Sequence, residues 1–525
     1  RFASVFPFVE QGTRPRTIGR LVANHDFVRA LLAHASYDDY LFSNPSPANL
    51  RTFATMARQW APGRRLTLVD YPGLPAALEA APPAVLYVGG WGFFMPGLHW
   101  LRSRLAQHRW PLCGMIFSLH GRDVVDHAVR LNRAQLRESD AIFCLSHDGL
   151  TAMRRLLDAT VEAAGRRRFP GRLLPPPLGV DDPALSTEGD RTRGRARLRI
   201  APDDVVLLVL GRMTPSQKMD LGPLLVAFAR RMLPSARVPL TLVLAGGASP
   251  SDIELVKGSV ERLGLEARVR LHPNLSLALR ADLVAMSDVL VSPVDNTQET
   301  FGLSLLEAQG AGLPVVASRF DGYKDLVRDG VDGFLVDTWW AEAEPFDAWF
   351  DLGEPNVVQL QQSQGVAVDL DQLTDRVLRL AHDPDLRQRM GAAGREKVAA
   401  QYVWRRVIGR YEAVWDELAE AARREPDPLV EANPFNVPAT RVFAHYASRT
   451  VDARTVVVAT GAPLDEQAYT DAAPWLPAAV VARVVEAAHT PVTVERLAEL
   501  VATDVPAVSY VVRWLMKYGV VRVRA

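Results

Sequence analysis

The sequence predicts an α/β protein with two domains built on parallel sheets, followed by a small, mostly helical C-terminal domain. Apolar runs of strand length alternate with helical runs up to about residue 395. This alternation is typical of parallel sheets that helices cover on both faces. After a polar stretch at residues 423–428, amphipathic helical segments follow without that alternation.

The first domain is predicted from strand-like runs that are separated by helical ones. The expected strands are residues 2–9, 40–43, 84–88, 114–119 and 141–146, and the expected helices are residues 21–35 and 150–159. Residues 173–181, with three consecutive prolines, predict a stiff and extended connector to the next domain. In such sheets ligands bind beyond the carboxyl ends of the strands.

The second domain contains the most informative segment of the chain, a predicted strand–loop–helix–strand unit over residues 285–318. Glu299 falls in its loop and Glu307 lies about two turns into its helix. The backbone N–H groups of Phe301, Gly302 and Leu303 are expected at the helix N-terminus, which favours a bound anion. Carboxylates accept hydrogen bonds from sugar hydroxyls. Anion-binding amides beside two carboxylates fit a nucleotide-sugar.

The rest of the chain is predicted to be largely helical. Residues 373–420 form a helical region that is broken at residues 383–384 and again at the glycines of residues 391–394. Helices are expected at 478–488, at 493–500 with Thr493 as N-cap, and at 505–518, before a strand at 520–523. Residues 338–365 form an insertion with several tryptophans and acidic residues, for which the sequence gives no role.

Composition limits the possible function classes. The net charge is zero, so no overall field attracts nucleic acid or an acidic membrane. The two cysteines, Cys113 and Cys144, lie in apolar runs and suggest a reducing cytoplasm. No run reaches the 18 or so apolar residues of a transmembrane helix, and no metal-ligand spacing is present. The chain begins with Arg1, so an upstream or removed targeting segment stays an open alternative.

Five motifs, in order, resemble the retaining GT-B glycosyltransferases, and most nearly the sucrose-synthase-like group called family 4. In the central motif, seven residues separate Glu299 from Glu307. Phe-Gly-Leu stands shortly after the first glutamate, and Gly-Leu-Pro-Val-Val-Ala-Ser follows at residues 312–318. The others are a strand-Gly-Arg-loop-Lys element at 208–218, a core strand at 242–247, a glycine-rich run at 321–336 and a Tyr-Val-Trp helix start at 402–407.

The resemblance implies two Rossmann-like domains that face a cleft. It assigns residues 1–185 to the acceptor-side domain, 186–395 to the nucleotide-sugar donor domain and 396–425 to a crossover helix and linker. Residues 426–525 resemble a winged-helix accessory module. It also implies a cytoplasmic enzyme that transfers a sugar, with retention and without a metal or other cofactor, from a nucleotide-sugar to a hydroxyl acceptor.

The resemblance also implies roles for individual residues. Arg212 and Lys218, beside Gly211, would hold the donor diphosphate. Glu299, with the amides of Phe301, Gly302 and Leu303, would bind the transferred sugar, and Glu307 would accept the ribose hydroxyls. His120, at a strand end, would be the cleft histidine that contacts the donor sugar.

Two features depart from the family or leave its function open. Residues 12–19 lack the Gly-Gly-x-Gly loop that many members have, and residues 89–94 either line the acceptor side or pack in the core. The alternatives are a phosphorylase or epimerase on the same architecture, and a nucleic-acid- or protein-binding regulator with an inactive body. The last predicted helix holds only Arg513 and Lys517 as cations. The module is therefore expected to bind a protein or peptide acceptor and not DNA.

Overall fold

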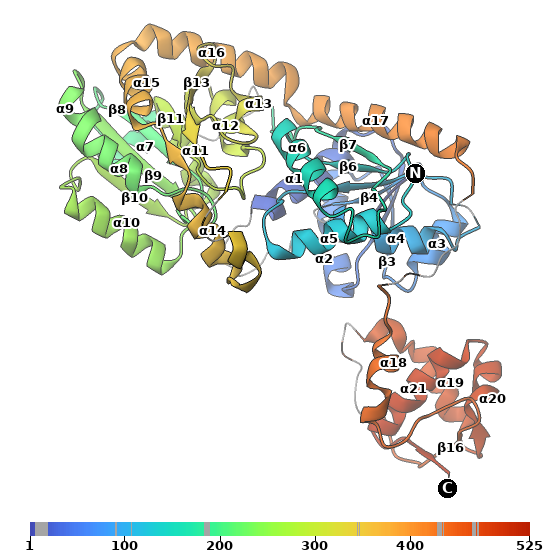
Figure 1. Ribbon diagram of the computed structural model, residues 1–525. Helices are drawn as coiled ribbons and strands as arrows, with labels where there is room; N and C mark the ends of the chain where they lie inside the picture. Colours follow the sequence, from blue (N-terminus) through green and yellow to red (C-terminus); the bar gives the residue numbers. More distant parts are fainter. Residues whose placement is uncertain are drawn as a thin grey trace.

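The computed structural model describes residues 1–5, 19–89, 92–106, 108–182, 190–343, 345, 347–427, 433, 435–464, 469 and 472–524. Two sheet-containing domains lie side by side, and a small third unit is separate from both (Figure 1). The predicted loop at residues 12–18, the strand beyond Val5, and Gly90 and Trp91 lie outside the described residues.

The first domain is built on a seven-stranded parallel sheet with the order β3-β2-β1-β4-β5-β6-β7. Its strands are β1 (Phe2–Val5), β2 (Asp39–Ser43), β3 (Arg65–Val69), β4 (Val85–Val88), β5 (Leu112–Met115), β6 (Ala141–Phe143) and β7 (Arg172–Leu174). Its helices are α1 (Gly19–His34), α2 (Pro47–Trp60), α3 (Leu74–Ala80), α4 (Met95–Arg102), which follows the short turn η1 (Gly92–Phe94), α5 (Arg122–Arg133) and α6 (His147–Ala159). The central strands β1 and β4 are buried throughout, as their unbroken apolar sequences require.

The second domain repeats this plan with a six-stranded parallel sheet in the order β10-β9-β8-β11-β12-β13. Its strands are β8 (Val205–Leu210), β9 (Leu240–Gly246), β10 (Val269–Pro273), β11 (Val289–Ser292), β12 (Val315–Ser318) and β13 (Gly333–Val336). Its helical segments up to residue 326 are α7 (Arg191–Leu198), α8 (Gly222–Ala227), η3 (Phe228–Met232), α9 (Leu233–Ser235), α10 (Pro250–Arg262), α11 (Leu277–Met286), α12 (Leu303–Gly310) and α13 (Tyr323–Leu326).

Two sequence predictions about boundaries were wrong. The expected strand at residues 114–119 is β5, which ends at Met115; the chain then leaves the sheet, and the carbonyl of Phe117 bonds to the second domain instead. The expected break at residues 391–394 is absent, because α16 (Pro384–Gln401) runs through it. A Cβ on Gly391 would lie 1.9 Å from the carbonyl oxygen of Gly312. These glycines therefore allow close packing of α16 on α12 and do not end a helix.

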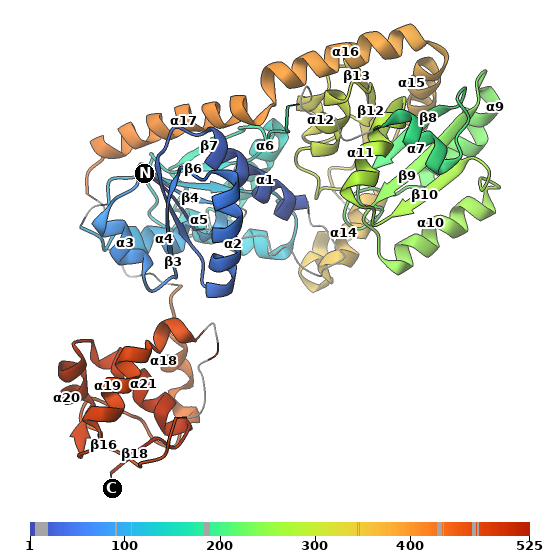
Figure 2. The same ribbon diagram turned by 180° about the vertical axis from the view of Figure 1, so that it is seen from behind.

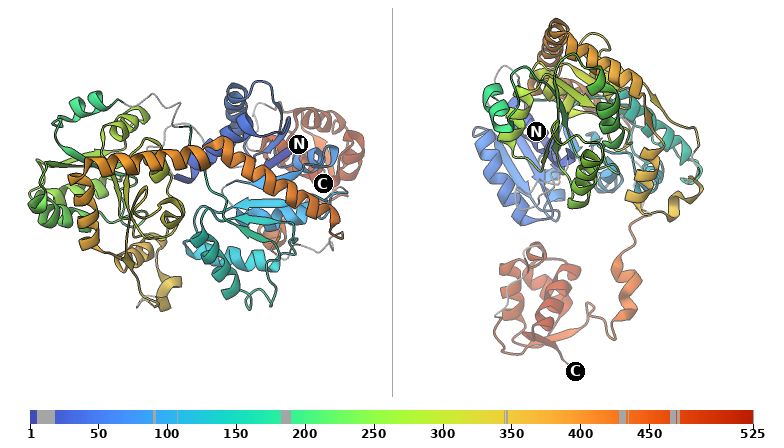
Figure 3. Two further views of the ribbon diagram at one scale, coloured as in Figure 1. Left: turned by 90° about the horizontal axis from the view of Figure 1, so that it is seen from above. Right: turned by 90° about the vertical axis from the view of Figure 1, so that its left-hand side faces the viewer.

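Helix α17 (Trp404–Arg424) returns from the second domain and lies across the first. Seen from above, α16 and α17 extend along both domains (Figure 3). Trp415 of α17 is fully buried, with its ring centroid 5.1 Å from that of Phe2 and 5.9 Å from that of Tyr87. The chain passes between the two domains twice. The two connecting segments pair with each other, since Val180 and Val403 form a parallel bridge. Helix α17 therefore completes the core of the first domain.

The insertion of the second domain comprises β14 (Thr338–Trp339), η4 (Asp347–Leu352), α14 (Pro355–Gln364) and β15 (Ala367–Val368), before α15 (Leu370–His382). Helix α14 is bonded to the loop after β8. Ser363 donates to the carbonyl of Pro215 at 3.2 Å, and Gln364 donates to the carboxylate of Asp220 at 3.0 Å. The insertion thus braces the loop that carries Lys218, a role that the sequence did not reveal.

The third unit has a three-stranded antiparallel sheet in the order β17-β16-β18 packed against three helices. Its elements are α18 (Ala439–Phe443), η5 (Ala444–Tyr446), β16 (Val456–Ala459), η6 (Ala473–Trp475), α19 (Ala478–Ala487), β17 (Val492–Thr493), α20 (Val494–Val501), α21 (Val505–Lys517) and β18 (Val521–Val523). The three main helices and the N-cap role of Thr493 agree with the prediction. Figure 2 shows the unit clear of the two sheet domains.

The linker to the third unit is tied to the first domain. Ser139 donates its backbone N–H to Glu425 at 2.7 Å, and Arg109 donates to Asp427 at 2.9 Å. The ring of Phe435 lies 6.3 Å from that of Trp100 and under the guanidinium of Arg130. Residues 436–450 are exposed throughout. The independent part of the chain therefore begins just after Phe435.

Candidate active site

The candidate site lies where β8 and β11 end, on the side of the second domain that faces the first. The strand order of the second sheet reverses between these two neighbours, and ligands of open α/β sheets bind at such a switch point. Gly211 follows β8, and the loop from Pro293 to Gly302 joins β11 to α12. All the donor-side residues expected from the sequence therefore lie on two adjacent loops or on α12.

Lys218 and Glu299 form an ion pair across these two loops. Both side chains are nearly buried, with 11% and 13% of their side-chain surface exposed. Burial and the nearby Arg212 lower the pKa of Lys218, while Asp321 opposes this. Glu299 thus holds the ammonium of Lys218 where the two loops meet.

Arg212 lies beside this pair and has only neutral partners. It donates to the side-chain oxygen of Gln217 at 2.8 Å and to that of Gln298 at 3.3 Å. Burial lowers its pKa, and no carboxylate in the described part of the chain is within ion-pair distance of it. A guanidinium that is desolvated without an anion favours a bound anion strongly.

Glu307 is paired with Arg280 of α11, a partner that the sequence did not suggest. Burial raises the pKa of Glu307; Arg280 opposes this rise, and the carboxylates of Asp26 and Asp181 add to it. Asp26 and Asp181 belong to the first domain and its connector, so Glu307 lies close to the domain boundary. About a third of its side chain is exposed, which leaves it accessible to a ligand.

The backbone between the two glutamates is tightly constrained. Gly302, the N-cap of α12, has φ 115°, and a Cβ there would lie 2.6 Å from the ring of Tyr323. The N–H of Phe301 donates to Glu299 at 3.2 Å. The N–H groups of Gly302 and Leu303 have no backbone partner in the described structure. Two of the three predicted amides are therefore available at the start of α12.

Hydrogen bonds join the second domain to the first. Thr300 donates to the carbonyl of Phe117 at 2.6 Å, and Ser146 donates to Asp321 at 3.2 Å. Burial raises the pKa of Asp321 to about 7, and the neighbouring Asp148 adds to the rise. The loop after β5 thus lies against the loop between β11 and α12, and the start of α6 lies against the turn that follows β12.

His120 lies three residues after Phe117, in that same loop of the first domain. It is half-buried, and burial lowers its pKa to about 4, with Asp123 opposing. The imidazole is therefore neutral near pH 7. No hydrogen bond joins His120 to Lys218 or Glu299 among the described residues, so its role as the cleft histidine stays a prediction.

Sequence reasoning missed several residues around the site. Asp295 is buried and accepts the N–H of Asp220, and burial raises its pKa to about 8. The Tyr323 hydroxyl is 2.8 Å from that of Ser292 beneath Gly302. Asp295 directly follows a predicted strand, which is a usable signal. Arg280 and Tyr323 lie in ordinary helical sequence and give none.

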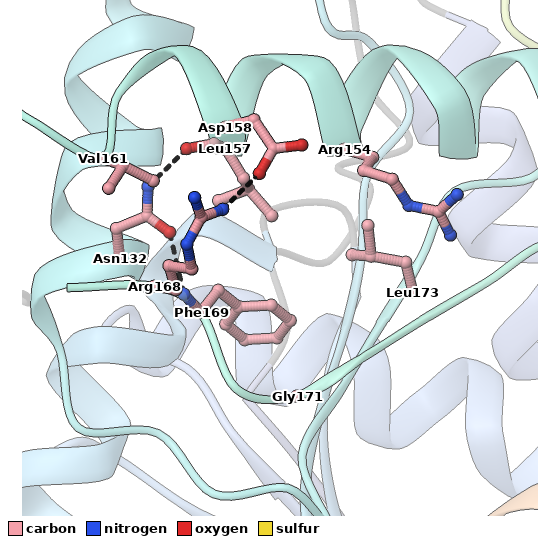
Figure 4. A pocket seen from close by; sticks show the side chains of 9 residues that line it. All are labelled: Asn132, Arg154, Leu157, Asp158, Val161, Arg168, Phe169, Gly171 and Leu173. Atoms are coloured by element: carbon pink, nitrogen blue, oxygen red, sulfur yellow. Dashed lines mark hydrogen bonds and ion pairs between the residues drawn. The ribbon is translucent and has the colours of Figure 1, made fainter. Parts of the chain in front are cut away.

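A separate hollow of about 230 Å³ lies in the first domain, between α5, α6 and β7 (Figure 4). Arg154, Arg168, Asp158 and Phe169 line it, and Arg168 donates to Asp158 at 2.6 Å. Asn132 is already bonded to the backbone N–H of Phe169 and to the carbonyl of Leu157. None of the residues predicted from the motifs lines this hollow.

Glu307→Gln is expected to weaken donor binding by about 1–3 kcal/mol, the range for hydrogen bonds to charged groups, with a smaller effect on turnover. Isothermal titration calorimetry with the donor measures the dissociation constant. Arg280→Ala is the matched control: it breaks the same ion pair but keeps the carboxylate, so donor binding should not weaken. Equal losses in both variants would show that the ion pair, and not a ribose contact, matters.

The class of protein follows from comparisons with known proteins. Residues 190–344 match the family described as glycosyl transferases group 1. Among solved structures, HepE of Anabaena in complex with UDP and glucose superposes with a TM-score of 0.53 at 17% identity, covering 79% of this chain and 99% of that one. A glycosyltransferase of Rickettsia africae gives a TM-score of 0.52 at 13% identity, covering 79% and 97%. The fold is GT-B, as expected.

Curated relatives match parts of the chain. The D-inositol 3-phosphate glycosyltransferase of Geodermatophilus obscurus is 40% identical over 174 residues, which are 32% of this chain and 37% of that protein. The enzyme of the same name from Streptomyces scabiei is 30% identical over 302 residues, 53% of this chain and 66% of that protein. The chain therefore spans less than two thirds of the length of either relative. Residues 190–344 are a glycosyl transferase group 1 domain.

Proposed function

We propose that this protein is a retaining glycosyltransferase that moves a sugar from a nucleotide-sugar to a hydroxyl acceptor without a metal ion. The observation that carries the proposal is the arrangement of Arg212 and Lys218 beside Glu299 at the switch point of the second sheet. A buried lysine beside a half-buried arginine suits a diphosphate, and the carboxylate suits the hydroxyls of the attached sugar.

Donor binding would exchange partners within the site. The diphosphate would take Lys218 from Glu299, which frees the carboxylate to accept hydrogen bonds from the sugar. The ribose hydroxyls would likewise replace Arg280 at Glu307. Each ion pair of the empty site thus keeps its carboxylate near the position that the ligand requires.

The cations would act most strongly during transfer. The bond between the anomeric carbon and the β-phosphate oxygen would break, and a bond to the acceptor oxygen would form on the same face while the acceptor hydroxyl passes its proton to the departing phosphate oxygen. Negative charge grows on the leaving nucleoside diphosphate, where Arg212 and Lys218 would stabilise it. The neutral His120 would contact the donor sugar from the first domain.

A donor screen tests the proposal. The protein is incubated with UDP-, GDP-, ADP- and TDP-sugars, and thermal shift and release of nucleoside diphosphate are measured with and without EDTA. One nucleotide-sugar should stabilise the protein and be slowly hydrolysed, with D-inositol 3-phosphate among the acceptors because of the relatives' names. Activity should survive EDTA. Turnover lost with EDTA and restored by a divalent ion would contradict the metal-free mechanism, and no stabilisation by any donor would contradict transfer itself.

The third unit is proposed to recognise the acceptor, because it stands apart from the site on a linker. Tethering raises the effective concentration of a bound acceptor near the cleft. A chain ending at Asn436 keeps the packing of Asp427 and Phe435 on the first domain. It should retain donor hydrolysis but lose transfer efficiency on a protein or peptide acceptor, measured as kcat/KM. Full acceptor activity in this folded variant would contradict the recognition role.

A further inference from the structure

One face of the third unit combines aromatic and basic side chains. Tyr510, Arg513, Trp514, Lys517 and Tyr518 follow the helical spacing of three and four residues along α21, so they form a single stripe. Tyr510 is 41% exposed, and the rings of Trp514 and Tyr518 contact each other edge-on at 5.1 Å. Trp514 and Tyr518 are partly buried against the core of the unit, to which α21 contributes Val508, Val511, Val512 and Leu515.

The exposed cations of α21 and β18 lack acidic partners. Arg513 and Lys517 on α21, and Arg522 and Arg524 at β18, are exposed. Helix α21 packs against β18 on the side where Val521 is buried, whereas Arg522 and Arg524 alternate with Val521 and lie on the other side of the sheet. No carboxylate of the described residues lies within ion-pair distance of these four side chains, whereas Arg496 of α20 pairs with Glu499. This part of the third unit therefore carries uncompensated positive charge, although the whole chain is neutral.

Strand β18 presents an open edge beside the stripe. Its only partner among the described strands is β16. The carbonyl of Val520 and the N–H of Arg524 bond towards β16. Backbone groups alternate in direction along a strand, so those of Val521 and Val523 point away from it. An edge of this kind accepts an extended chain as a further strand.

We propose that α21 and β18 together bind an extended acidic peptide segment, which adds to the edge of β18 as a strand. Its alternating carboxylates would face Arg522 and Arg524 on the sheet face away from α21. Apolar side chains between them would pack on Val523, which is 41% exposed, and on the rings of the stripe. A nucleic acid could use the cations and rings, but its backbone lacks the N–H and C=O groups that pair with an open strand edge. The open edge therefore favours a peptide.

The test is fluorescence anisotropy with the full-length protein and no donor, so its outcome is independent of the transferase proposal. The probe is a fluorescein-labelled peptide of about twelve residues, in which glutamate alternates with valine or threonine in strand register. Three comparison ligands are the same peptide with lysine for glutamate, the acidic peptide N-methylated at alternate residues, and a single-stranded DNA of similar charge.

We expect the acidic peptide to bind, and its affinity to fall with added salt. The lysine and N-methylated peptides should not bind. The double variant Arg522→Glu/Arg524→Glu should weaken binding by about tenfold or more, since contacts between close charges are strong at interfaces. Arg454→Glu is the control: Arg454 is exposed in the turn whose Ala453 carbonyl accepts the N–H of Glu495 at the start of α20. It should leave binding unchanged.

Three results would overturn the proposal: no binding of the acidic peptide, equal binding of the N-methylated peptide, or tighter binding of the DNA than of the peptide at the same salt concentration. Unchanged peptide binding in the double variant would overturn it as well. Circular dichroism of each variant shows whether the unit is folded, and the N-methylated peptide tests strand addition without any substitution.

Discussion

Lys218→Ala should reduce turnover by roughly a hundredfold to a thousandfold, the range for loss of one group that stabilises developing charge. Donor affinity should fall much less, because charge on the β-phosphate grows only as the glycosidic bond breaks. In the free protein the substitution also leaves Glu299 without its cation. Steady-state kinetics and donor calorimetry on the same preparation separate the two effects.

Lys257→Ala is the control for this experiment. Lys257 lies on α10, is exposed, and pairs with Glu254 at 3.2 Å away from the site, so both parameters should stay unchanged. If Lys218→Ala weakened donor binding and left turnover unchanged, Lys218 would bind donor and transition state equally. The assignment to the leaving group would then be wrong.

Trp415→Ala should lower the free energy of unfolding of the first domain by about 3–5 kcal/mol, as truncation of a buried tryptophan usually does. Trp415 is fully buried and packs on Phe2, Phe27 and Tyr87, so its removal leaves a cavity that rigid strands cannot fill. Urea denaturation followed by circular dichroism measures the loss.

Trp339→Ala is the matched control, because that side chain is 66% exposed on the insertion and its loss should change stability little. A small effect of Trp415→Ala would mean that α17 contributes little to the first domain. Donor binding by the folded fraction should remain, because the donor residues belong to the second domain.

The sequence predicted the fold well where apolar periodicity and glycine placement agree. The order of strand, loop and helix around Glu299 and Glu307 was predicted correctly, since β11, the loop and α12 each have a distinct local signal, but Glu307 lies about one turn into α12 and not two. The glycines of α16 misled, because a glycine that allows close packing resembles one that ends a helix. Local sequence alone cannot separate these cases.

The site was predicted only in part, and the missing part is tertiary. Lys218 and Glu299 were expected in one site, but their direct pairing depends on how two distant loops meet. The pairing of Arg280 with Glu307 depends on the relative position of α11 and α12. The loops that carry the motif residues are predictable from sequence, whereas the partners with which these residues pair are not.

The return of α17 to the first domain has a consequence for synthesis on the ribosome. The first sheet is complete once β7 ends at Leu174, yet its hydrophobic core stays open until Trp415 arrives from beyond the second domain. The second domain can therefore finish folding while the first still exposes aromatic rings such as those of Phe2 and Tyr87. An exchange of domains between related genes would have to move the segment that ends at Arg424 together with the N-terminal half.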